Sequence, residues 1–207
     1  MNVSDELFQA LMLLPPDFEA IEQLIRQEKY TPECMGETFC RFLEECFCEY
    51  SEFIEQYGRN PQDEEIHSTY VYPLCKIMLQ YGLNPNNTFG EENSETNVMY
   101  EVYWLDKPYV AADTLKLLLE HGGDPLLQVD GESIWAMADF DLSFDVYEGY
   151  AHQDWYFHKF QGRFHYWLVL RGFLYPEEKY LREHALYTCN LVQIDKVHWD
   201  IQAVRKP

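Results

Sequence analysis

Three short stretches of this chain are variants of one phrase: QYGRNP at residues 56–61, QYGLNP at residues 80–85 and EHGGDP at residues 120–125. Each follows an apolar run. A glycine at the end of an amphipathic helix readily adopts the left-handed conformation of a helix C-cap. The Asn or Asp that comes next favours a turn, and the proline prevents the helix from resuming. Each copy therefore predicts a helix, a glycine cap and a turn, in that order.

The spacing of apolar residues predicts helices in several segments. Within residues 74–81, apolar side chains follow the i, i+3, i+4, i+7 spacing of one helical face. One apolar face persists through residues 37–57, and an earlier helix is predicted within residues 18–28. Thr31 followed by Pro32 is a helix start signal, because it combines a cap with a proline in the first turn.

The remaining segments have weaker patterns. Residues 84–97 and 127–133 are polar and contain turn residues, so we expect loops there. We find no convincing strand pattern before residue 190, and residues 192–197 are compatible with either a strand or a helix. Recurrence of one unit every few tens of residues is typical of a stacked helical array.

The composition limits the kinds of partner. The chain has 207 residues, of which 47% are hydrophobic and 16% aromatic, and a formal net charge of −21. Residues 1–158 hold 7 basic and 31 acidic residues, a net charge of −24, whereas residues 159–207 hold 8 basic and 5 acidic residues, a net charge of +3. Such acidity disfavours direct binding to nucleic acid or to an anionic membrane surface. It favours a basic partner, which the field would steer toward the acidic region.

The character of the N-terminus and the spacing of the cysteines predict an intracellular location. Charges interrupt every window of about 20 residues, the length that a membrane-spanning helix needs. The N-terminus is acidic, whereas a secretory signal begins with a positive region. We therefore expect a cytoplasmic location. Six cysteines occur without any C-x-x-C spacing, so we expect free, reduced thiols rather than a zinc or redox motif.

No residue pattern indicates catalysis, a metal or a cofactor. His152, His158 and His165 are six and seven residues apart, whereas the zinc-binding helix motif needs two histidines at i and i+4. A G-x-S-x-G nucleophile signature is absent. We therefore expect no enzymatic activity. The alternative is an enzyme whose active site uses the histidines and aromatic residues of the C-terminal region.

Acidic and aromatic residues alternate in the segment 139–155. Aromatic side chains supply most of the binding energy at many interfaces, and carboxylates select cationic partners and accelerate association. The alternative is that the aromatic residues belong to the core and the acids to a solvated rim. The candidate partner-binding residues are Trp104, Asp106, Tyr109, Trp135, Asp139, Asp141, Asp145, Tyr147, Glu148, Asp154 and Trp155.

One part of the chain resembles a known family. Residues 114–125, TLKLLLEHGGDP, resemble the second helix and turn of an ankyrin repeat, in which an apolar helix runs into LLL-x-x-G-A-D-P; here Gly123 replaces the usual Ala. Residues 130–138, DGESIWAMA, resemble the start of the next repeat, D-G-x-T-P-L-x-x-A. The resemblance is strong over residues 110–138 and moderate over residues 70–100. The glycine caps are 24 and 40 residues apart, which departs from the regular period of about 33.

This resemblance implies a mainly α fold. The expected architecture is a degenerate ankyrin-like solenoid of helical hairpins over residues 1–175, with non-standard N-terminal helices and a C-terminal capping element at residues 176–207, all in one compact unit. Ankyrin repeats bind protein partners and generally perform no chemistry.

Size and charge suggest by analogy an inhibitor of a basic protein, as an immunity protein inhibits its toxin. Three alternatives are a nucleic-acid mimic that inhibits a DNA- or RNA-binding enzyme, an enzyme, and a scaffold whose acidity serves solubility.

Overall fold

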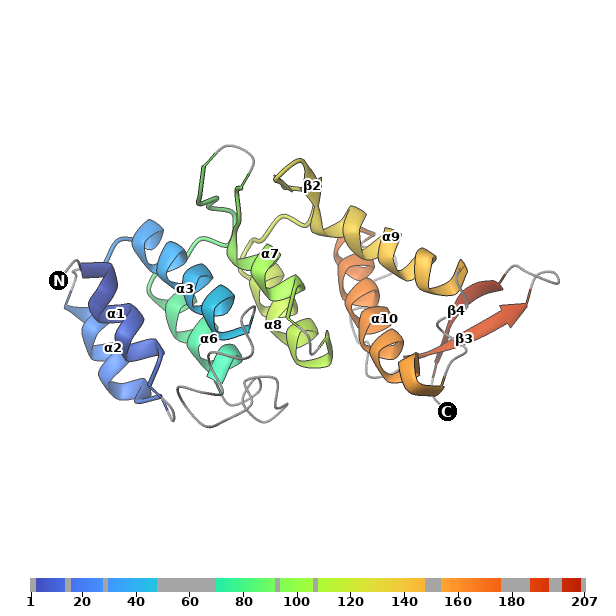
Figure 1. The fold of residues 1–207 in the computed structure, drawn as a ribbon, viewed down its shortest axis with the longest axis horizontal. Coiled ribbons are helices and arrows are strands. Elements are labelled where there is room, and N and C mark those ends of the chain that lie inside the picture. Colours follow the sequence, from blue (N-terminus) through green and yellow to red (C-terminus); the bar gives the residue numbers. More distant parts are fainter. Residues whose placement is uncertain are drawn as a thin grey trace.

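The computed structural model describes residues 3–13, 16–27, 30–47, 70–91, 94–105, 108–147, 154–175, 187–193 and 199–205. This part of the chain is mainly helical (Figure 1). The helices are α1 (Val3–Leu11), α2 (Phe18–Arg26), α3 (Pro32–Phe47), α6 (Tyr72–Gln80), α7 (Val98–Tyr103), α8 (Pro108–Glu120), α9 (Ile134–Tyr147) and α10 (Asp154–Leu174). The strands are β1 (Gln128–Val129), β2 (Glu132–Ser133), β3 (Tyr187–Gln193) and β4 (Trp199–Arg205).

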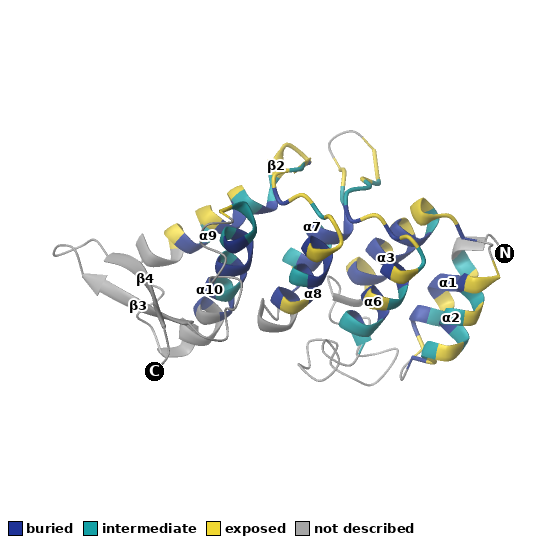
Figure 2. Cartoon of the chain, turned by 180° about the vertical axis from the view of Figure 1, so that it is seen from behind, coloured by how far each residue is buried: buried dark blue, intermediate teal, exposed yellow. Residues whose placement is uncertain are grey.

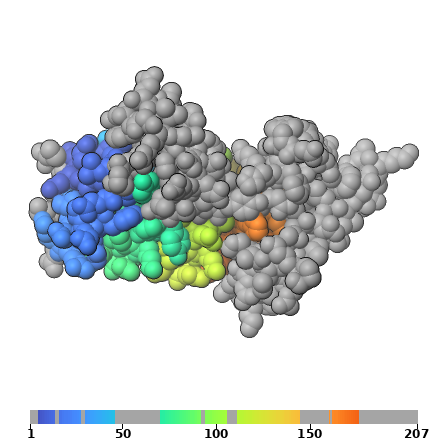
Figure 3. Space-filling view, turned by 90° about the horizontal axis from the view of Figure 1, so that it is seen from below, coloured from blue at the N-terminus to red at the C-terminus, as the bar shows by residue number. Residues whose placement is uncertain are grey.

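The helices form two ranks along the long axis of the molecule. In the first rank, α1 packs on α3, α3 on α7 and α7 on α9. In the second rank, α6 packs on α8 and α8 on α10, while α7–α8 and α9–α10 join the two ranks. Hydrogen bonds place α2 beside α6: the Tyr81 hydroxyl accepts from Arg26 Nε at 2.6 Å and donates to Glu22 at 2.7 Å. The space-filling view shows described segments following one another in chain order along this axis (Figure 3).

The repeated phrase ends α6 and α8 in the same way. Gly82 and Gly122 have φ angles of +96° and +92°, in the left-handed region. After α6, the N–H of Gly82 donates to Leu79 O at 3.2 Å and the N–H of Leu83 donates to Met78 O at 3.0 Å. The corresponding bonds after α8 are 3.1 and 3.0 Å long. This pair of bonds is the Schellman motif, so the predicted glycine caps are confirmed at both helices.

A tight turn follows each cap. The side chains of Asn84 and Asp124 accept the backbone N–H two residues further on, at 3.0 and 2.9 Å. Their backbone carbonyls accept the N–H three residues further on, at 3.2 and 3.1 Å. The predicted turns are therefore confirmed as well. The first copy of the phrase, at residues 56–61, lies outside the described residues.

Each turn leads into a short hairpin, and both hairpins project from the same edge of the molecule (Figure 1). In the first hairpin Phe89 pairs with Thr96, and in the second β1 pairs antiparallel with β2. Strands therefore occur before residue 190, where the sequence shows no convincing strand pattern, and residues 127–133, expected to be a loop, contain β1 and β2. Asp130 and Gly131 both have positive φ angles, at 51° and 83°, which suits a two-residue hairpin turn. Side-chain alternation could not reveal strands this short, because the turn sets their pairing.

After α10, the described residues form a second antiparallel pair, β3 and β4. β3 contacts α10 and β4 contacts α9. β3 begins at Tyr187, earlier than expected, and it includes Val192 and Gln193 from the segment whose structure the sequence left undecided. Residues 194–198 lie outside the described part of the chain.

The predicted helix start at Thr31 is confirmed, because its hydroxyl oxygen accepts the N–H of Cys34 at 3.2 Å. α3 then extends to Phe47. The rest of the helix predicted over residues 37–57 falls among residues that the structure does not describe. Asn97 caps α7 in a similar way, with its side chain accepting the N–H of Tyr100 at 2.8 Å.

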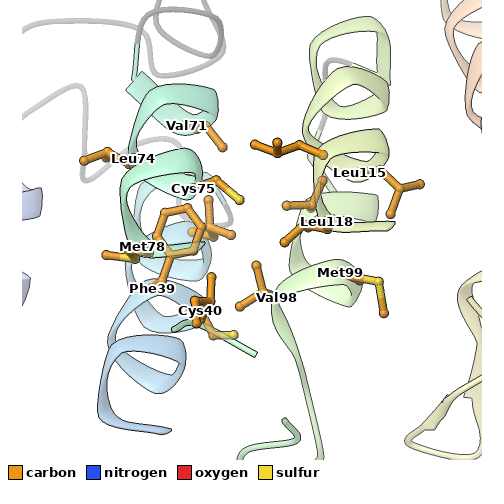
Figure 4. Packing of buried hydrophobic residues seen from close by; sticks show 14 of the residues in the cluster. Phe39, Cys40, Val71, Leu74, Cys75, Met78, Val98, Met99, Leu115 and Leu118 are labelled. Carbon is orange, nitrogen blue, oxygen red and sulfur yellow. The ribbon is translucent and has the colours of Figure 1, made fainter. Parts of the chain in front are cut away.

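A hydrophobic cluster fills the space between neighbouring helices (Figures 2 and 4). Phe39 from α3, Met78 from α6 and Leu118 from α8 are fully buried in it. Burying one such side chain stabilises a fold by about 1.5–3 kcal/mol. Among the described residues, Cys34, Cys40 and Cys75 are free thiols, and burial raises the pKa of the Cys40 thiol. None of the described helices combines the length and apolar character that crossing a bilayer requires.

Candidate functional site

Charge is divided unequally between the two ranks. The first-rank helices α1, α3, α7 and α9 contain ten acidic residues and one basic residue, a net charge of −9. The second-rank helices α2, α6, α8 and α10 contain five acidic and six basic residues, a net charge of +1. The one basic residue of the first rank, Arg41, donates to Glu45 at 2.8 Å and lies 3.8 Å from Asp5. These four helices contain no second basic residue that could pair with their other carboxylates.

A group of carboxylates lies where α3 meets α7. Burial raises the pKa of Glu101, a hydrogen bond from the Thr96 hydroxyl opposes this shift, and the negative charge of Glu44 raises the pKa further. Burial raises the pKa of Cys40 most, and the charges of Glu101, Glu44 and Glu37 raise it further. Among the described residues no Lys or Arg forms an ion pair with these three carboxylates. Their mutual repulsion would be relieved by an added cation.

Exposed aromatic side chains lie where α7 meets α9. The hydroxyl of Tyr103 donates a hydrogen bond to the carboxylate of Asp141, which joins the two helices. Trp104 is 55% exposed, and its ring makes an edge contact with Tyr103 at a centroid distance of 5.4 Å. On α9, Phe140 is 67% exposed and Phe144 44% exposed, and their rings stack at 6.1 Å. Exposed positions along α9 are visible in Figure 2.

α7 packs between α3 and α9 and contributes a residue to each group, so we consider the two groups together as one candidate surface of the first rank. Glu101 interacts with the α3 side and Tyr103 with the α9 side of the same short helix. We call this surface the acidic–aromatic strip. It consists of Glu37, Glu44, Glu101, Trp104, Phe140, Asp141 and Phe144.

A second aromatic group lies between α9 and α10. The rings of Trp135 and Trp167 stack at 6.3 Å, and Trp167 Nε1 donates to Asp139 at 3.0 Å. The guanidinium of Arg171 lies 4.9 Å from the centre of the Trp167 ring. Trp135 and Asp139 therefore make their contacts within the last helix pair, on the α10 side of α9.

The structure thus divides the candidate residues that the sequence grouped together. Trp104 and Asp141 belong to the acidic–aromatic strip, whereas Trp135 and Asp139 contact α10. Asp106 and Glu148 lie outside the described residues. The backbones of the remaining candidates lie in α8, α9 and α10, but their side chains are outside the described part: Tyr109, Asp145, Tyr147, Asp154 and Trp155.

Sequence reasoning missed Glu37, Glu44 and Glu101 as members of this surface, and it placed Phe140 and Phe144 in the alternating segment without including them among the candidate residues. The alternative that the aromatic residues of this segment belong to the core is wrong for Phe140 and Phe144. Their i, i+4 spacing places the two rings side by side on a helix but does not reveal whether that side is exposed. The carboxylates at the α3–α7 contact come from distant segments, and no local pattern connects them.

The described side chains contain no group of three or more His, Cys, Asp or Glu residues placed to hold a metal ion. His165, on α10, is half-buried beside the ring of Phe164, and the side chain of His158 lies outside the described residues. Neither protein-family models nor searches of curated proteins and of solved structures gave a match to this chain.

Proposed function

We propose that this chain is an ankyrin-like helical repeat protein that binds and inhibits a basic protein partner and catalyses no reaction itself. The observation that carries the proposal is the coincidence of two features on the first rank. This rank holds a net charge of −9, and it presents the exposed rings of Phe140 and Phe144.

The succession of elements supports the repeat assignment. The same order of elements occurs twice. The second-rank helices α6 and α8 are each followed by a Schellman cap, a turn in which an Asn or Asp side chain accepts a backbone N–H, a hairpin and a first-rank helix, α7 or α9. Each helix pair buries its apolar surface on its neighbours, as repeat units do. On this proposal the β3–β4 pair, which contacts α9 and α10, caps the array.

The chemistry of the strip supports a basic partner. Large exposed aromatic rings supply hot-spot area, and carboxylates around them select Lys and Arg and accelerate encounter. At an ionic strength of about 0.1 M the screening length is about 10 Å, so such attraction weakens as salt is added. A partner bound in this way is released by salt more readily than one bound by apolar contact alone.

Affinity capture with the full chain tests the proposal. Immobilised protein is exposed to native lysate, bound proteins are eluted in steps of NaCl, and the captured protein is identified and assayed for loss of its own activity. We expect a basic protein that salt releases. We expect the double substitution Trp104→Ala with Phe140→Ser to abolish capture, and Leu126→Ser to leave it unchanged. Leu126 is a suitable control because it is 54% exposed but lies in the turn after α8.

Two results would contradict the proposal. One is a captured partner whose binding does not change with salt, and the other is an enzymatic activity of the chain itself. Competition by DNA for the captured protein would instead favour a nucleic-acid mimic, because it would show that the strip covers a phosphate-binding site.

A further inference from the structure

The two ends of the acidic–aromatic strip differ in chemistry. Toward α3 it presents Glu37, Glu44 and Glu101, with no ion-pairing cation among the described residues. Toward α9 it presents three exposed rings and the carboxylate of Asp141, which already accepts a hydrogen bond from Tyr103. Cations are therefore favoured at one end, and apolar side chains at the other.

We propose that the strip binds a bipartite segment of its partner, whose Lys or Arg residues lie across the α3–α7 contact and whose apolar anchor packs on the rings at the α7–α9 contact. This inference rests on the proposed function and adds the kind of segment that the partner must present. Charge complementarity argues for it at the first end. Exposure of the rings of Trp104, Phe140 and Phe144 argues for it at the second.

The dimensions of the first rank limit the length of the segment. Packed helices lie about 8–10 Å apart, so a path from α3 across α7 to α9 is about 20 Å long. That distance corresponds to about 13 residues of α-helix, or to about 6 residues of extended chain. Both are within the size of a synthetic peptide.

The two ends should contribute differently to binding. Attraction between exposed carboxylates and Lys or Arg is screened by salt. Removal of apolar surface from water has no such dependence, and moderate NaCl leaves it nearly unchanged. Substitutions at the α3–α7 end should therefore reduce the salt dependence of binding. Substitutions at the α7–α9 end should weaken binding at every salt concentration.

The test uses the full chain and two synthetic peptides of about 15 residues, a length set by the helical rise. In the segregated peptide, Lys residues occupy one half and Leu and Phe the other half. In the interspersed peptide the same residues alternate. Fluorescence anisotropy measures both affinities in low and in moderate NaCl. We expect the segregated peptide to bind about thirtyfold more tightly, which corresponds to the loss of about 2 kcal/mol that defines a hot-spot contact.

Double-mutant cycles then assign each half of the peptide to one end of the strip. We expect Glu44→Gln to couple with a Lys→Ala change in the peptide, and Phe140→Ser to couple with a Leu→Ala change. Each coupling should be about fivefold, a usual size for residues in contact, and the crossed pairs should be additive. Leu126→Ser is the matched control on the protein, and circular dichroism confirms that every variant remains folded.

The outcomes separate this inference from the proposed function. Equal binding of the two peptides, or equal coupling of Glu44 to Lys and to Leu positions, overturns the bipartite segment and leaves a basic partner held by charge. Failure of both basic peptides to bind the folded protein in low salt overturns the proposed function as well.

Discussion

Two neighbouring glycines at the end of α8 are required for different reasons. Gly122 has a φ angle of +92°, and a Cβ atom added there would contact nothing within 4 Å. At Gly123 an added Cβ would lie 2.6 Å from the sulfur of Met99 and 3.0 Å from the carbonyl oxygen of Leu118. The first position needs glycine for its backbone conformation, and the second needs it for space. The departure from the ankyrin pattern at Gly123 thus follows from the packing of Met99.

Alanine at each position should therefore destabilise the fold by a different route. We expect Gly122→Ala to lower the free energy of unfolding by about 1–2 kcal/mol, the cost of a left-handed conformation. Gly123→Ala, although it restores the residue usual in ankyrin repeats, should lower it by about 1–3 kcal/mol through overpacking. Urea unfolding measures both.

Combination with Met99→Ala distinguishes the two routes. The double variant Met99→Ala with Gly123→Ala should be destabilised by less than the sum of the two single changes, because the sulfur that crowds the added Cβ is absent. Together with Gly122→Ala, Met99→Ala should be additive. Additivity at both positions would show that Met99 does not account for the glycine at position 123.

The carboxylate of Glu101 makes stability depend on pH. Because burial raises its pKa, the native state binds this proton more readily than the unfolded state does. The resulting stabilisation is present at low pH and is lost as pH rises through the raised pKa. The variant Glu101→Gln is neutral at every pH. We expect it to be more stable than the wild type at pH 7, and this advantage should shrink as pH falls to 4.5, the ordinary pKa of the side chain.

Urea unfolding at pH 7 and at pH 4.5 provides the measurement. The control is Glu132→Gln, which removes the same charge from an exposed position in β2. An advantage of Glu101→Gln that grows toward pH 4.5, or one that the control reproduces at both pH values, would argue against a role for the partly buried carboxylate of Glu101.

At the scale of elements, the ends of α6 and α8 could be predicted because six consecutive residues determine each of them. The cap, the turn and the proline act within one short segment, and the bonds of Gly82 and Gly122 follow. The exposed face of α9 could not be predicted in this way. Apolar residues occur around its whole circumference, and only packing against α7 and α10 leaves Phe140 exposed while it buries Leu142.

The side chain of Asn86 connects two successive turns. Its Nδ2 donates to Gly122 O at 2.9 Å, and its Oδ1 accepts the N–H of Asp124 at 2.8 Å. The equivalent position in the next turn is Leu126, which cannot make such bonds. This connection could not be predicted from the sequence, because it joins the end of α8 to a residue far earlier in the chain.

Loss of this connection should be measurable. We expect Asn86→Ala to lower the free energy of unfolding by about 1–2 kcal/mol, for two hydrogen bonds, and to accelerate hydrogen exchange at the N–H of Asp124. Asn87→Ala is the control, because the Oδ1 of Asn87 accepts only from Asn84 of the same turn, at 2.9 Å. Unchanged exchange at Asp124 in the Asn86 variant would mean that the bridge does not hold the two turns together.

At the scale of the whole molecule, the sorting of charge depends on which helix joins which rank. The net charge of −21 is evident from the sequence. The division of the described helices into a first rank of net charge −9 and a second rank of net charge +1 is not evident, because helices of the two ranks come in turn along the sequence. First-rank and second-rank helices alternate among the described helices, so an alternation of acidic and less acidic helices in the sequence becomes one acidic side in the structure.

This distribution predicts that salt stabilises the fold. The three ion pairs described, of which Arg26–Glu22 and Arg41–Glu45 are i, i+4 pairs, lie at exposed or half-exposed positions, where such pairs contribute little. Repulsion among unpaired carboxylates should dominate, and salt screens it. We therefore expect NaCl to raise the midpoint of urea unfolding, whereas a fold held by ion pairs would show the opposite shift.

The same salt should weaken partner binding, because it screens the attraction of the strip for Lys and Arg. The two effects of NaCl thus have opposite signs, so release of a partner by salt cannot be attributed to unfolding of this chain. Unfolding and peptide binding measured in the same NaCl series give both quantities. If the midpoint of urea unfolding fell as salt was added, the described ion pairs would outweigh the repulsion among carboxylates. Ion pairs within the fold, rather than a basic partner, would then explain the acidic side.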